Sequence, residues 1–299
     1  MLRSLLFAPG DSDKKMTKAS GIGADCVILD LEDSVAAQRK PVARGMVRDF
    51  LGGERPPGVA LYVRVNPLDS GLILDDLAAV APAAPDGIVL PKANGPQDLI
   101  TVGHFLDILE AEHGLPAGAM HILPVATETA AAVFTLGDYA CGVPRLSGLT
   151  WGAEDLGAAV GASANLDAHK DWTSPYQAVR ALCLFGAHAA DVQAIDTVMA
   201  DFRDLERLEV VCNEARRDGF TGKIAIHPAQ VEVINAAFSP SAAELEHARA
   251  VLALFAENPD AGTLQLDGKM IDRPHIVQAE RIVALDELLA ARASARRSG

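Results

Sequence analysis

Two carboxylates in the middle of the chain follow apolar runs and could together bind a metal ion. Residues 120–126 form one run, which leads into Glu128, and residues 146–151 form another, which leads into Asp155. If both runs are parallel neighbouring strands, the two acids lie on the same rim of the sheet. Two converging carboxylates suit an oxygen-preferring divalent cation such as Mg²⁺. The alternative is that both acids cap helices that begin where the strands end.

An arginine ends a third apolar run. Arg64 lies within YVRVN, residues 62–66. A lone arginine at a strand end is more often part of a structural ion pair, but beside two metal-binding acids its planar fork could hold a substrate carboxylate bidentately. A metal and an arginine together suit a 2-oxo acid, because the metal polarises the carbonyl while the arginine secures the carboxylate.

Such a site could perform aldol-type chemistry. In the cleavage direction, a β-hydroxy thioester loses its hydroxyl proton, and the carbon–carbon bond breaks to leave a 2-oxo acid and a thioester enolate. A further acid or base must handle the proton at the enolate carbon. We see no conspicuous lysine in a strand centre as a Schiff-base candidate, which favours metal chemistry over an imine.

These residues belong to a regular alternation of short apolar runs and helical stretches. The predicted strands are residues 2–8, 25–31, 60–65, 87–90, 120–126, 146–151, 191–195 and 222–226. The runs are apolar on both faces, which is typical of a parallel sheet covered on both sides. Eight strand–helix units in roughly 235 residues predict a (β/α)₈ TIM barrel. A doubly wound sheet is the rival, but no Gly-x-Gly-x-x-Gly follows the first strand.

A barrel predicts that functional residues gather at the C-terminal ends of its strands. The polar residues found there are Glu32, Asp33, Arg64, Lys92, Glu128, Glu154, Asp155 and His227. We interpret Glu32 and Asp33 as rim acids that orient neighbouring cations. His227 follows the last predicted barrel strand and could act as a base or ligand.

The last part of the chain departs from this pattern. Residues 241–258 predict an amphipathic helix, residues 263–271 a hairpin turning at Asp267-Gly268, and residues 274–290 a closing helix. Residues 293–299 are expected to fray. We therefore divide the chain into a barrel, residues 1–238, and a C-terminal extension, residues 239–299, that forms a lid or contacts another subunit.

Composition excludes several classes of protein. Hydrophobic residues make up 49% and aromatic residues 5%, which indicates a soluble α/β protein. The net charge of −14 argues against non-specific nucleic-acid binding. No apolar run approaches the ~18 residues of a membrane span, and the start breaks at Pro9-Gly10, as a first strand would. Four cysteines without CxxC spacing predict free buried thiols in a reducing cytoplasm.

The motifs, in their order, resemble the citrate lyase β-subunit-like enzymes of the HpcH/HpaI aldolase superfamily. This group includes malyl-CoA, citramalyl-CoA and β-methylmalyl-CoA lyases. The resemblance covers nearly the whole chain and is carried by RSLLFAPG (3–10), ADCVILDLEDSV (24–35), YVRVNP (62–67), GIVLPK (87–92), LPVATETA (123–130), LTWGAEDLGA (149–158), GFTGKIAIHPAQV (219–231) and GKMIDRPHI (268–276). It implies a TIM barrel, Mg²⁺ and a trimeric or hexameric assembly.

The resemblance also assigns roles to single residues. It implies Glu128 and Asp155 as metal ligands and Arg64 as the substrate-carboxylate clamp, aided by backbone N–H groups around Glu154 and Asp155. The catalytic acid/base matches Asp272, which would reach the active site of a neighbouring subunit. From the residues alone, Asp272 would be a helix cap ahead of a proline in the first turn.

Coenzyme A contacts follow from the same resemblance. Lys18 matches the phosphate-contacting lysine, and Phe7 lies beside that pocket. This chain departs from its relatives at Ser12, where they often carry an arginine three positions after the proline of the first motif. Lys14 or Lys15 could supply that charge.

The expected activity is Mg²⁺-dependent cleavage or formation of a β-hydroxyacyl-CoA such as malyl-CoA or citramalyl-CoA, with acetyl-CoA (or propionyl-CoA) and glyoxylate or pyruvate as partners. One alternative is the citryl-thioester lyase subunit of citrate lyase, acting on an acyl carrier protein. A second is a malyl-CoA thioesterase. A third, from another class, is a non-catalytic CoA-binding or assembly protein, which the presence of Glu128, Asp155 and Arg64 disfavours.

Overall fold

The computed structural model describes residues 1–298, with side chains described for residues 1–297. The chain divides into two compact units, one spanning Leu2–Ala237 and one that begins at Phe238 and takes in Met1. Each unit has its own apolar core.

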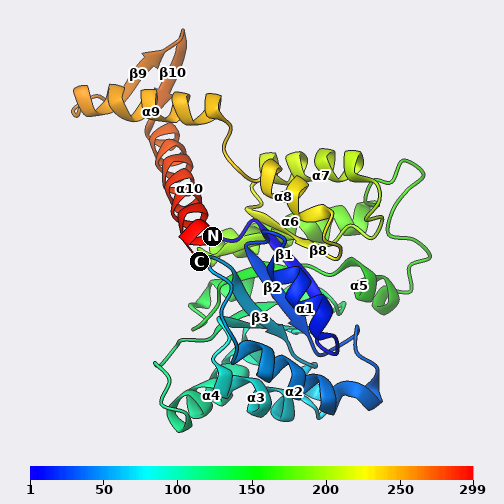
Figure 1. Cartoon of the computed structure of the whole chain (residues 1–299). Helices are drawn as coiled ribbons and strands as arrows, with labels where there is room; N and C mark the ends of the chain where they lie inside the picture. Colours follow the sequence, from blue (N-terminus) through cyan, green and yellow to red (C-terminus); the bar gives the residue numbers. More distant parts are fainter. Residues whose placement is uncertain (299) are drawn as a thin grey trace. The chain divides into compact units, whose positions relative to one another are not determined.

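Within residues 1–298, eight parallel strands form the sheet of the larger unit (Figure 1). They are β1 (Ser4–Pro9), β2 (Cys26–Asp30), β3 (Ala60–Arg64), β4 (Gly87–Leu90), β5 (His121–Pro124), β6 (Gly148–Thr150), β7 (Gln193–Asp196) and β8 (Gly222–Ala225). Their order is β5-β4-β3-β2-β1-β8-β7-β6. Parallel bridges from Ile122 to Leu146 and from Val125 to Thr150 join β5 to β6, so the ring is nearly closed. The predicted TIM barrel is confirmed.

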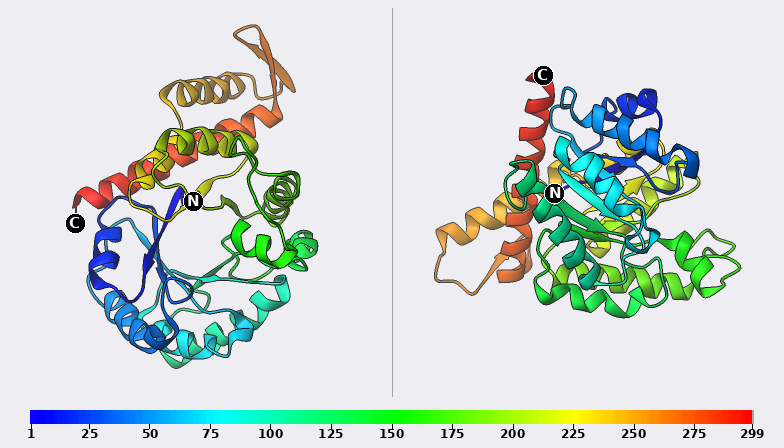
Figure 2. Two further views of the ribbon diagram at one scale, coloured as in Figure 1. Left: turned by 90° about the vertical axis from the view of Figure 1, so that its right-hand side faces the viewer. Right: turned by 90° about the horizontal axis from the view of Figure 1, so that it is seen from below.

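Helices surround this ring, as the left view of Figure 2 shows. They are α1 (Asp13–Ser20), α2 (Lys40–Leu51), α3 (Ile73–Val80), α4 (Pro96–Glu112), α5 (Ala153–Val160), α6 (Ser174–Ala189), α7 (Leu205–Asp218) and α8 (Gln230–Ala237). A 3₁₀ helix, Ala132–Cys141, takes the place of a long α-helix between β5 and β6. Proline in the first turn of α2, α4 and α6 is compatible with a helix start because the missing N–H has no partner there anyway.

The barrel interior is filled by apolar side chains from alternate strand positions. They are Leu5, Cys26, Ile28, Tyr62, Val89, Leu123, Val125, Ile195 and Ile224. Because side chains alternate along a strand, the residues next to Ile195 and Ile224 point the other way, into the layer beneath the helices. This packed interior holds the strand ends at fixed positions, and the rim residues follow them.

A charged cluster lies in that outer layer. Asp196 and Lys223 are register partners on β7 and β8, are 2% and 3% exposed, and form an ion pair at 3.0 Å. The indole Nε1 of Trp151 donates to the other Asp196 oxygen at 2.8 Å. Lys223 is a buried lysine within β8, paired with Asp196. It faces away from the barrel interior, so it does not supply an imine-forming group there.

The smaller unit is a helix, a hairpin and a second helix. Helix α9 (Ala242–Glu257) begins with a capping box between Ser241 and Glu244. Strands β9 (Thr263–Leu266) and β10 (Lys269–Asp272) pair antiparallel around Asp267-Gly268, both with positive φ, as a two-residue hairpin turn requires. Helix α10 spans Arg273–Ser298, so residues 293–298 of the segment expected to fray are helical, and residue 299 lies outside the described residues. The predicted helical and hairpin extension is confirmed.

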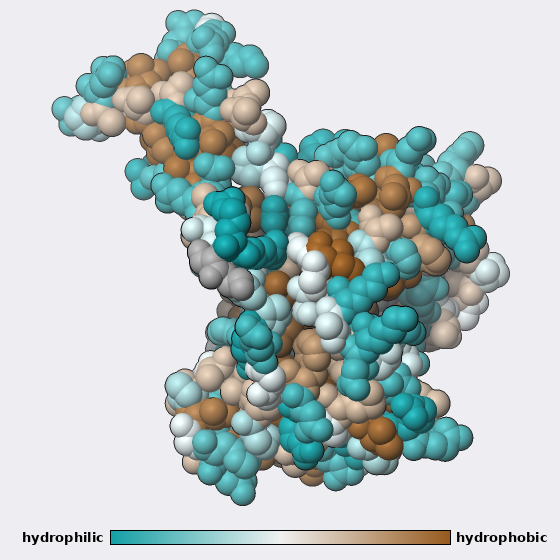
Figure 3. Space-filling view, viewed as in Figure 1, coloured by the Kyte–Doolittle hydropathy of each residue, from teal (hydrophilic) through white to brown (hydrophobic). Residues whose placement is uncertain are grey.

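The surface mixes hydrophilic side chains with small apolar patches on the face shown in Figure 3. Cys26, Cys183 and Cys212 are buried free thiols, as predicted, whereas Cys141 is exposed. None of the described helices combines the length and apolarity needed to cross a lipid bilayer.

Candidate active site

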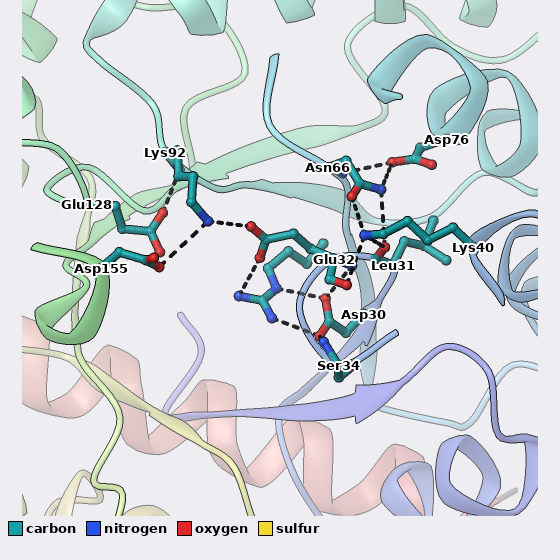
Figure 4. A network of polar contacts seen from close by, with 11 residues as sticks. Asp30, Leu31, Glu32, Ser34, Lys40, Asn66, Asp76, Lys92, Glu128 and Asp155 are labelled. Carbon is teal, nitrogen blue, oxygen red and sulfur yellow. Dashed lines mark hydrogen bonds and ion pairs between the residues drawn. The ribbon is translucent and has the colours of Figure 1, made fainter. Parts of the chain in front are cut away.

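Six charged residues converge at the C-terminal rim of strands β2 to β6 (Figure 4). They are Asp30, Glu32, Arg64, Lys92, Glu128 and Asp155. Asp30 and Arg64 are the last residues of β2 and β3, and Lys92 follows β4 by two positions. Asp155 lies in the first turn of α5, directly after β6. The barrel therefore brings together residues that are far apart in the sequence.

The two acids predicted to bind metal lie close to one another. Glu128 is 7% exposed, and its Oε2 accepts a hydrogen bond from the backbone N–H of Lys92. Burial raises the pKa of Glu128 to about 8; the hydrogen bond from Lys92 opposes this rise, and the nearby charge of Asp155 adds to it. A buried carboxylate, Glu128, beside a partly exposed one, Asp155, forms a site that a cation would stabilise.

The space around Glu128 is shaped for its carboxylate. A Cβ at Gly152 would lie 2.7 Å from Cγ of Glu128, so a side chain there would displace the acid. The N–H of Gly152 donates to Oγ1 of Thr127 at 3.0 Å, which ties the end of β5 to the end of β6. This bond fixes the spacing of the loops that carry Glu128 and Asp155.

These residues fit a divalent cation that keeps part of its water shell. Within residues 1–298, no cluster of three or more His, Cys, Asp or Glu side chains is arranged for metal binding. Mg²⁺ does not need one, because it commonly takes one or two carboxylates and completes its octahedron with water and substrate oxygens. The donor set of Glu128 and Asp155 suits Mg²⁺ better than a metal that prefers nitrogen or sulfur.

Arg64 is held firmly in the site. Its Nε and Nη2 donate to the two oxygens of Asp30 at 2.7 and 2.8 Å, and its Nη1 lies 2.9 Å from Oε2 of Glu32. The ring of Phe7 packs 4.5 Å from its guanidinium carbon. Burial disfavours the charged form, but Asp30 outweighs this effect and raises the pKa of Arg64. Two of its five N–H groups donate to Asp30, so N–H groups on Nη1 and Nη2 remain for a ligand carboxylate.

Glu32 connects the two cations of the site. Its Oε1 accepts a hydrogen bond from Nζ of Lys92 at 2.6 Å, while Oε2 faces Arg64. Burial raises the pKa of Glu32, against the opposing effects of Arg64 and Lys92. Glu32 thus orients an arginine and a lysine, as we predicted for a rim acid. Asp33, by contrast, is exposed.

A second layer of polar contacts fixes the loop that carries Glu32. Nζ of Lys40 donates to the backbone carbonyls of Leu31 and Glu32, each at 3.0 Å, and to the side chain of Asn66. Asn66 in turn donates to Asp76 on α3 at 2.7 Å. Figure 4 shows this chain of contacts running from the rim toward α3.

Sequence reasoning missed Asp30, Lys40 and the contacts of Lys92. Asp30 is 1% exposed and ends the strand that faces Arg64 in register. The signal available in the sequence was an aspartate as the last residue of an otherwise apolar run, which is a costly position for an unpaired charge.

Other predicted residues lie outside this cluster. The side chain of Glu154 is exposed and accepts a hydrogen bond from Asn165 at 3.0 Å. Lys18 is exposed on α1. His227 stacks on Phe202 with a centroid distance of 4.5 Å, and its Nδ1 accepts the N–H of Ala229, an arrangement that favours a structural role.

Asp272 belongs to the smaller unit. It is the last residue of β10 and directly precedes α10. Its Oδ1 lies 2.6 Å from Nδ1 of His275, and both side chains are partly exposed.

A cavity of about 430 Å³ lies apart from these rim contacts. Its lining includes Glu154, Trp172, Arg180, Asp196 and Lys223, but none of Arg64, Lys92, Glu128 or Asp155.

Comparison with known proteins places the chain among aldolases and carbon–carbon bond lyases. Residues 3–228 match the family described as HpcH/HpaI aldolase/citrate lyase, and residues 182–289 match C–C bond lyases of the TIM-barrel fold. The chain is 37% identical to a (3S)-malyl-CoA thioesterase of Cereibacter sphaeroides, over 97% of this chain and 96% of that protein. It is 31% identical to the mitochondrial citramalyl-CoA lyase of Rattus norvegicus, over 95% and 85%.

A solved crystal structure is similar to this chain in both fold and sequence. The crystal structure of protein CitE from Mycobacterium tuberculosis, in complex with magnesium, acetoacetate and coenzyme A, superposes with a TM-score of 0.76. The two chains are 32% identical, and the match covers 94% of this chain and 97% of the other.

Proposed function

Because this chain belongs to the HpcH/HpaI aldolase/citrate lyase family, we propose that it is a Mg²⁺-dependent carbon–carbon lyase acting on a β-hydroxyacyl-CoA. Malyl-CoA and citramalyl-CoA are the proposed substrates, with acetyl-CoA or propionyl-CoA and glyoxylate or pyruvate as products. The observation that carries the proposal is the convergence of two acids, Glu128 and Asp155, on the rim that also presents Arg64. That combination suits a 2-oxo acid.

Glu128 and Asp155 would hold the metal ion. When bound there, Mg²⁺ supplies Lewis-acid polarisation of the oxo-acid carbonyl. The magnesium and acetoacetate of the M. tuberculosis relative support this part of the proposal. Arg64 would bind the carboxylate of the same oxo acid with N–H groups on Nη1 and Nη2 that do not donate to Asp30.

Cleavage needs no oxidant, reductant or co-reactant, because one carbon–carbon bond breaks and one proton is lost and one gained. The hydroxyl proton leaves, the bond between the hydroxyl carbon and the α-carbon of the thioester breaks, and its electron pair passes into the thioester enolate. The enolate carbon then takes up a proton, which gives the acyl-CoA. We assign that proton transfer to Asp272 of another copy of the chain, which makes a homotrimer or hexamer with shared sites part of the proposal.

Phe7 and Lys18 are the proposed contacts to coenzyme A. Phe7 already packs against Arg64, so a ligand there would lie next to the oxo-acid clamp. Lys18 is exposed on α1 and free to turn toward a phosphate. The CoA of the M. tuberculosis relative supports a CoA ester as the substrate form.

A panel of β-hydroxyacyl-CoA esters tests the proposal. With Mg²⁺ present, we expect at least one ester to release a free 2-oxo acid and an acyl-CoA, and EDTA to stop the reaction until Mg²⁺ is restored. Release of no oxo acid from any ester would overturn the proposal. Turnover of free CoA esters would also exclude an obligatory acyl carrier protein.

Thioester hydrolysis is the second candidate, favoured by the (3S)-malyl-CoA thioesterase relative. Hydrolysis consumes water and gives malate and free CoA, whereas cleavage gives glyoxylate and acetyl-CoA. Product analysis on malyl-CoA separates the two, because only hydrolysis releases a free thiol.

A further inference from the structure

Lys92 contacts three acids of the rim, Glu32, Glu128 and Asp155. Its ammonium lies 2.6 Å from Oε1 of Glu32 and 3.7 Å from Oδ2 of Asp155, and its backbone N–H donates to Glu128 (Figure 4). Through Glu32 it is also one contact away from Arg64. Lys92 thus joins both proposed metal ligands, one through its backbone and the other through its side chain.

The backbone of Lys92 is adapted to these contacts. Its φ of 53° lies in the left-handed region, which is unfavourable for a residue with a side chain. Such strain persists where surrounding contacts over-determine the conformation, commonly at functional sites. Here the N–H is directed to one proposed metal ligand and the side chain to the other.

Lys92 also determines the charge of the site. With all acids ionised, Asp30, Glu32, Glu128 and Asp155 carry four negative charges, and Arg64 and Lys92 carry two positive charges. The formal sum of −2 equals the charge that one divalent cation neutralises. The ammonium lies 2.6 Å from Glu32 and 3.7 Å from Asp155, and these carboxylates stabilise its positive charge.

We propose that Lys92 sets the charge balance of the site, weakening metal binding and strengthening oxo-acid binding. The proposal rests on the proposed function, because it takes Glu128 and Asp155 as the metal ligands. The ammonium competes with the metal for Asp155. Without Lys92 the site would carry a formal −3, which attracts a divalent cation more strongly and repels a carboxylate.

A purely structural role predicts a different outcome. If Lys92 only held Glu32 and Asp155 in place, its loss would disorder the metal ligands and the Arg64 clamp together. The metal ion and the oxo acid would then both bind more weakly. The two explanations therefore differ in the sign of the change in metal affinity.

The experiment compares the parent protein with Lys92→Met, Lys92→Gln and Lys92→Arg. Mn²⁺ binding is followed by electron paramagnetic resonance of the free ion, and pyruvate binding by calorimetry at saturating Mg²⁺. For the Met and Gln variants we expect Mn²⁺ to bind more tightly and pyruvate more weakly, each on the order of tenfold. The Arg variant keeps the charge and should change both constants far less.

Weaker or unchanged Mn²⁺ binding in the Met and Gln variants would overturn the proposal. Circular dichroism confirms that each variant is folded, and Gln retains a hydrogen-bond donor for Glu32 if Met does not fold. These binding measurements use no CoA ester, so they are independent of the cleavage assay. Normal binding of Mn²⁺ and pyruvate, together with no cleavage of any CoA ester in that assay, would overturn the lyase reaction alone. A parent that binds neither Mn²⁺ nor pyruvate would overturn the metal site and the Lys92 role together.

Discussion

Asp30 and Arg64 face each other in register on β2 and β3, and the arginine donates two hydrogen bonds to the two oxygens of the aspartate. Asp30 is in turn held by the backbone N–H groups of Glu32 and Ser34, at 2.9 and 3.1 Å. Burial opposes the charged carboxylate, but Arg64 outweighs it and lowers the pKa of Asp30. The proposed carboxylate clamp is thus fixed by a buried acid and not by its own rotamer preference.

Replacing Asp30 should misalign that clamp. In Asp30→Asn the amide cannot accept at both positions, so Arg64 loses one of its two orienting bonds. We expect kcat/KM for the CoA ester to fall roughly 10- to 100-fold. Steady-state kinetics tests this. The exposed partner of Arg44, Asp75, provides the matched control: Asp75→Asn also removes an arginine ion pair, yet should leave kcat/KM unchanged.

The same pair should matter for stability. Asp30 is buried, and removing one partner of a buried ion pair costs about 3–5 kcal/mol, because the other charge is left uncompensated. Asp30→Ala should therefore lower the free energy of unfolding by this amount, and Asp75→Ala by less than about 1 kcal/mol. Urea denaturation measures both values. Equal effects of the two substitutions would contradict the buried-pair interpretation.

Metal should change stability through Glu128 and Asp155. A ligand that binds only the folded chain stabilises it by about 2.7 kcal/mol at 100 times its dissociation constant. Mg²⁺ should raise the melting temperature of the parent, and Asp155→Asn should abolish that rise. Without metal and above about pH 8, where Glu128 is ionised, Asp155→Asn should be more stable than the parent, because it removes a charge that repels Glu128. Asp33→Asn, at an exposed rim acid, is the control.

The fold and the rim positions of Glu128 and Asp155 could be predicted from the sequence, because both depend on residues that are neighbours in the chain. Apolar runs followed by acids predicted the strands and the rim positions of Glu128 and Asp155, because a strand and the residue after it are neighbours in the chain. Contacts between strands depend on register, which no single run contains. The Asp30–Arg64 pair and the reach of Lys92 to Glu32 and Asp155 are contacts of this kind.

Acid should weaken the seam between β5 and β6 in a defined pH range. Glu110 pairs with Arg145 and accepts N–H groups from Gly118 and Met120, and the carbonyl of Arg145 accepts the N–H of Ile122 on β5. Burial opposes the charged Glu110, but these partners outweigh it and lower the pKa to about 2, from 4.5. A depressed folded pKa gives stability that is complete above about pH 4.5 and is lost as the pH falls toward 2.

Glu110→Gln isolates that contribution. At pH 7 the variant should be less stable than the parent by about 3 kcal/mol, and the difference should shrink steadily between pH 4.5 and pH 2. Chemical denaturation at a series of pH values provides the measurement. A stability difference that does not depend on pH would show that packing, and not the charge of Glu110, stabilises the seam.

Mixing two inactive variants tests whether Asp272 acts on another copy of the chain. Asp155→Ala lacks a metal ligand and Asp272→Ala lacks the proposed proton carrier, so each alone should be inactive. In a randomly mixed trimer with sites between neighbours, about a quarter of the sites combine an intact Asp155 from one subunit with an intact Asp272 from the next. Refolding the variants together should therefore restore about a quarter of parental activity, measured as oxo-acid release. No recovery in mixed oligomers, verified by a tag on one variant, would mean that each site uses the Asp272 of its own chain, whereas an Asp272→Ala variant that is active alone would mean that Asp272 is not used.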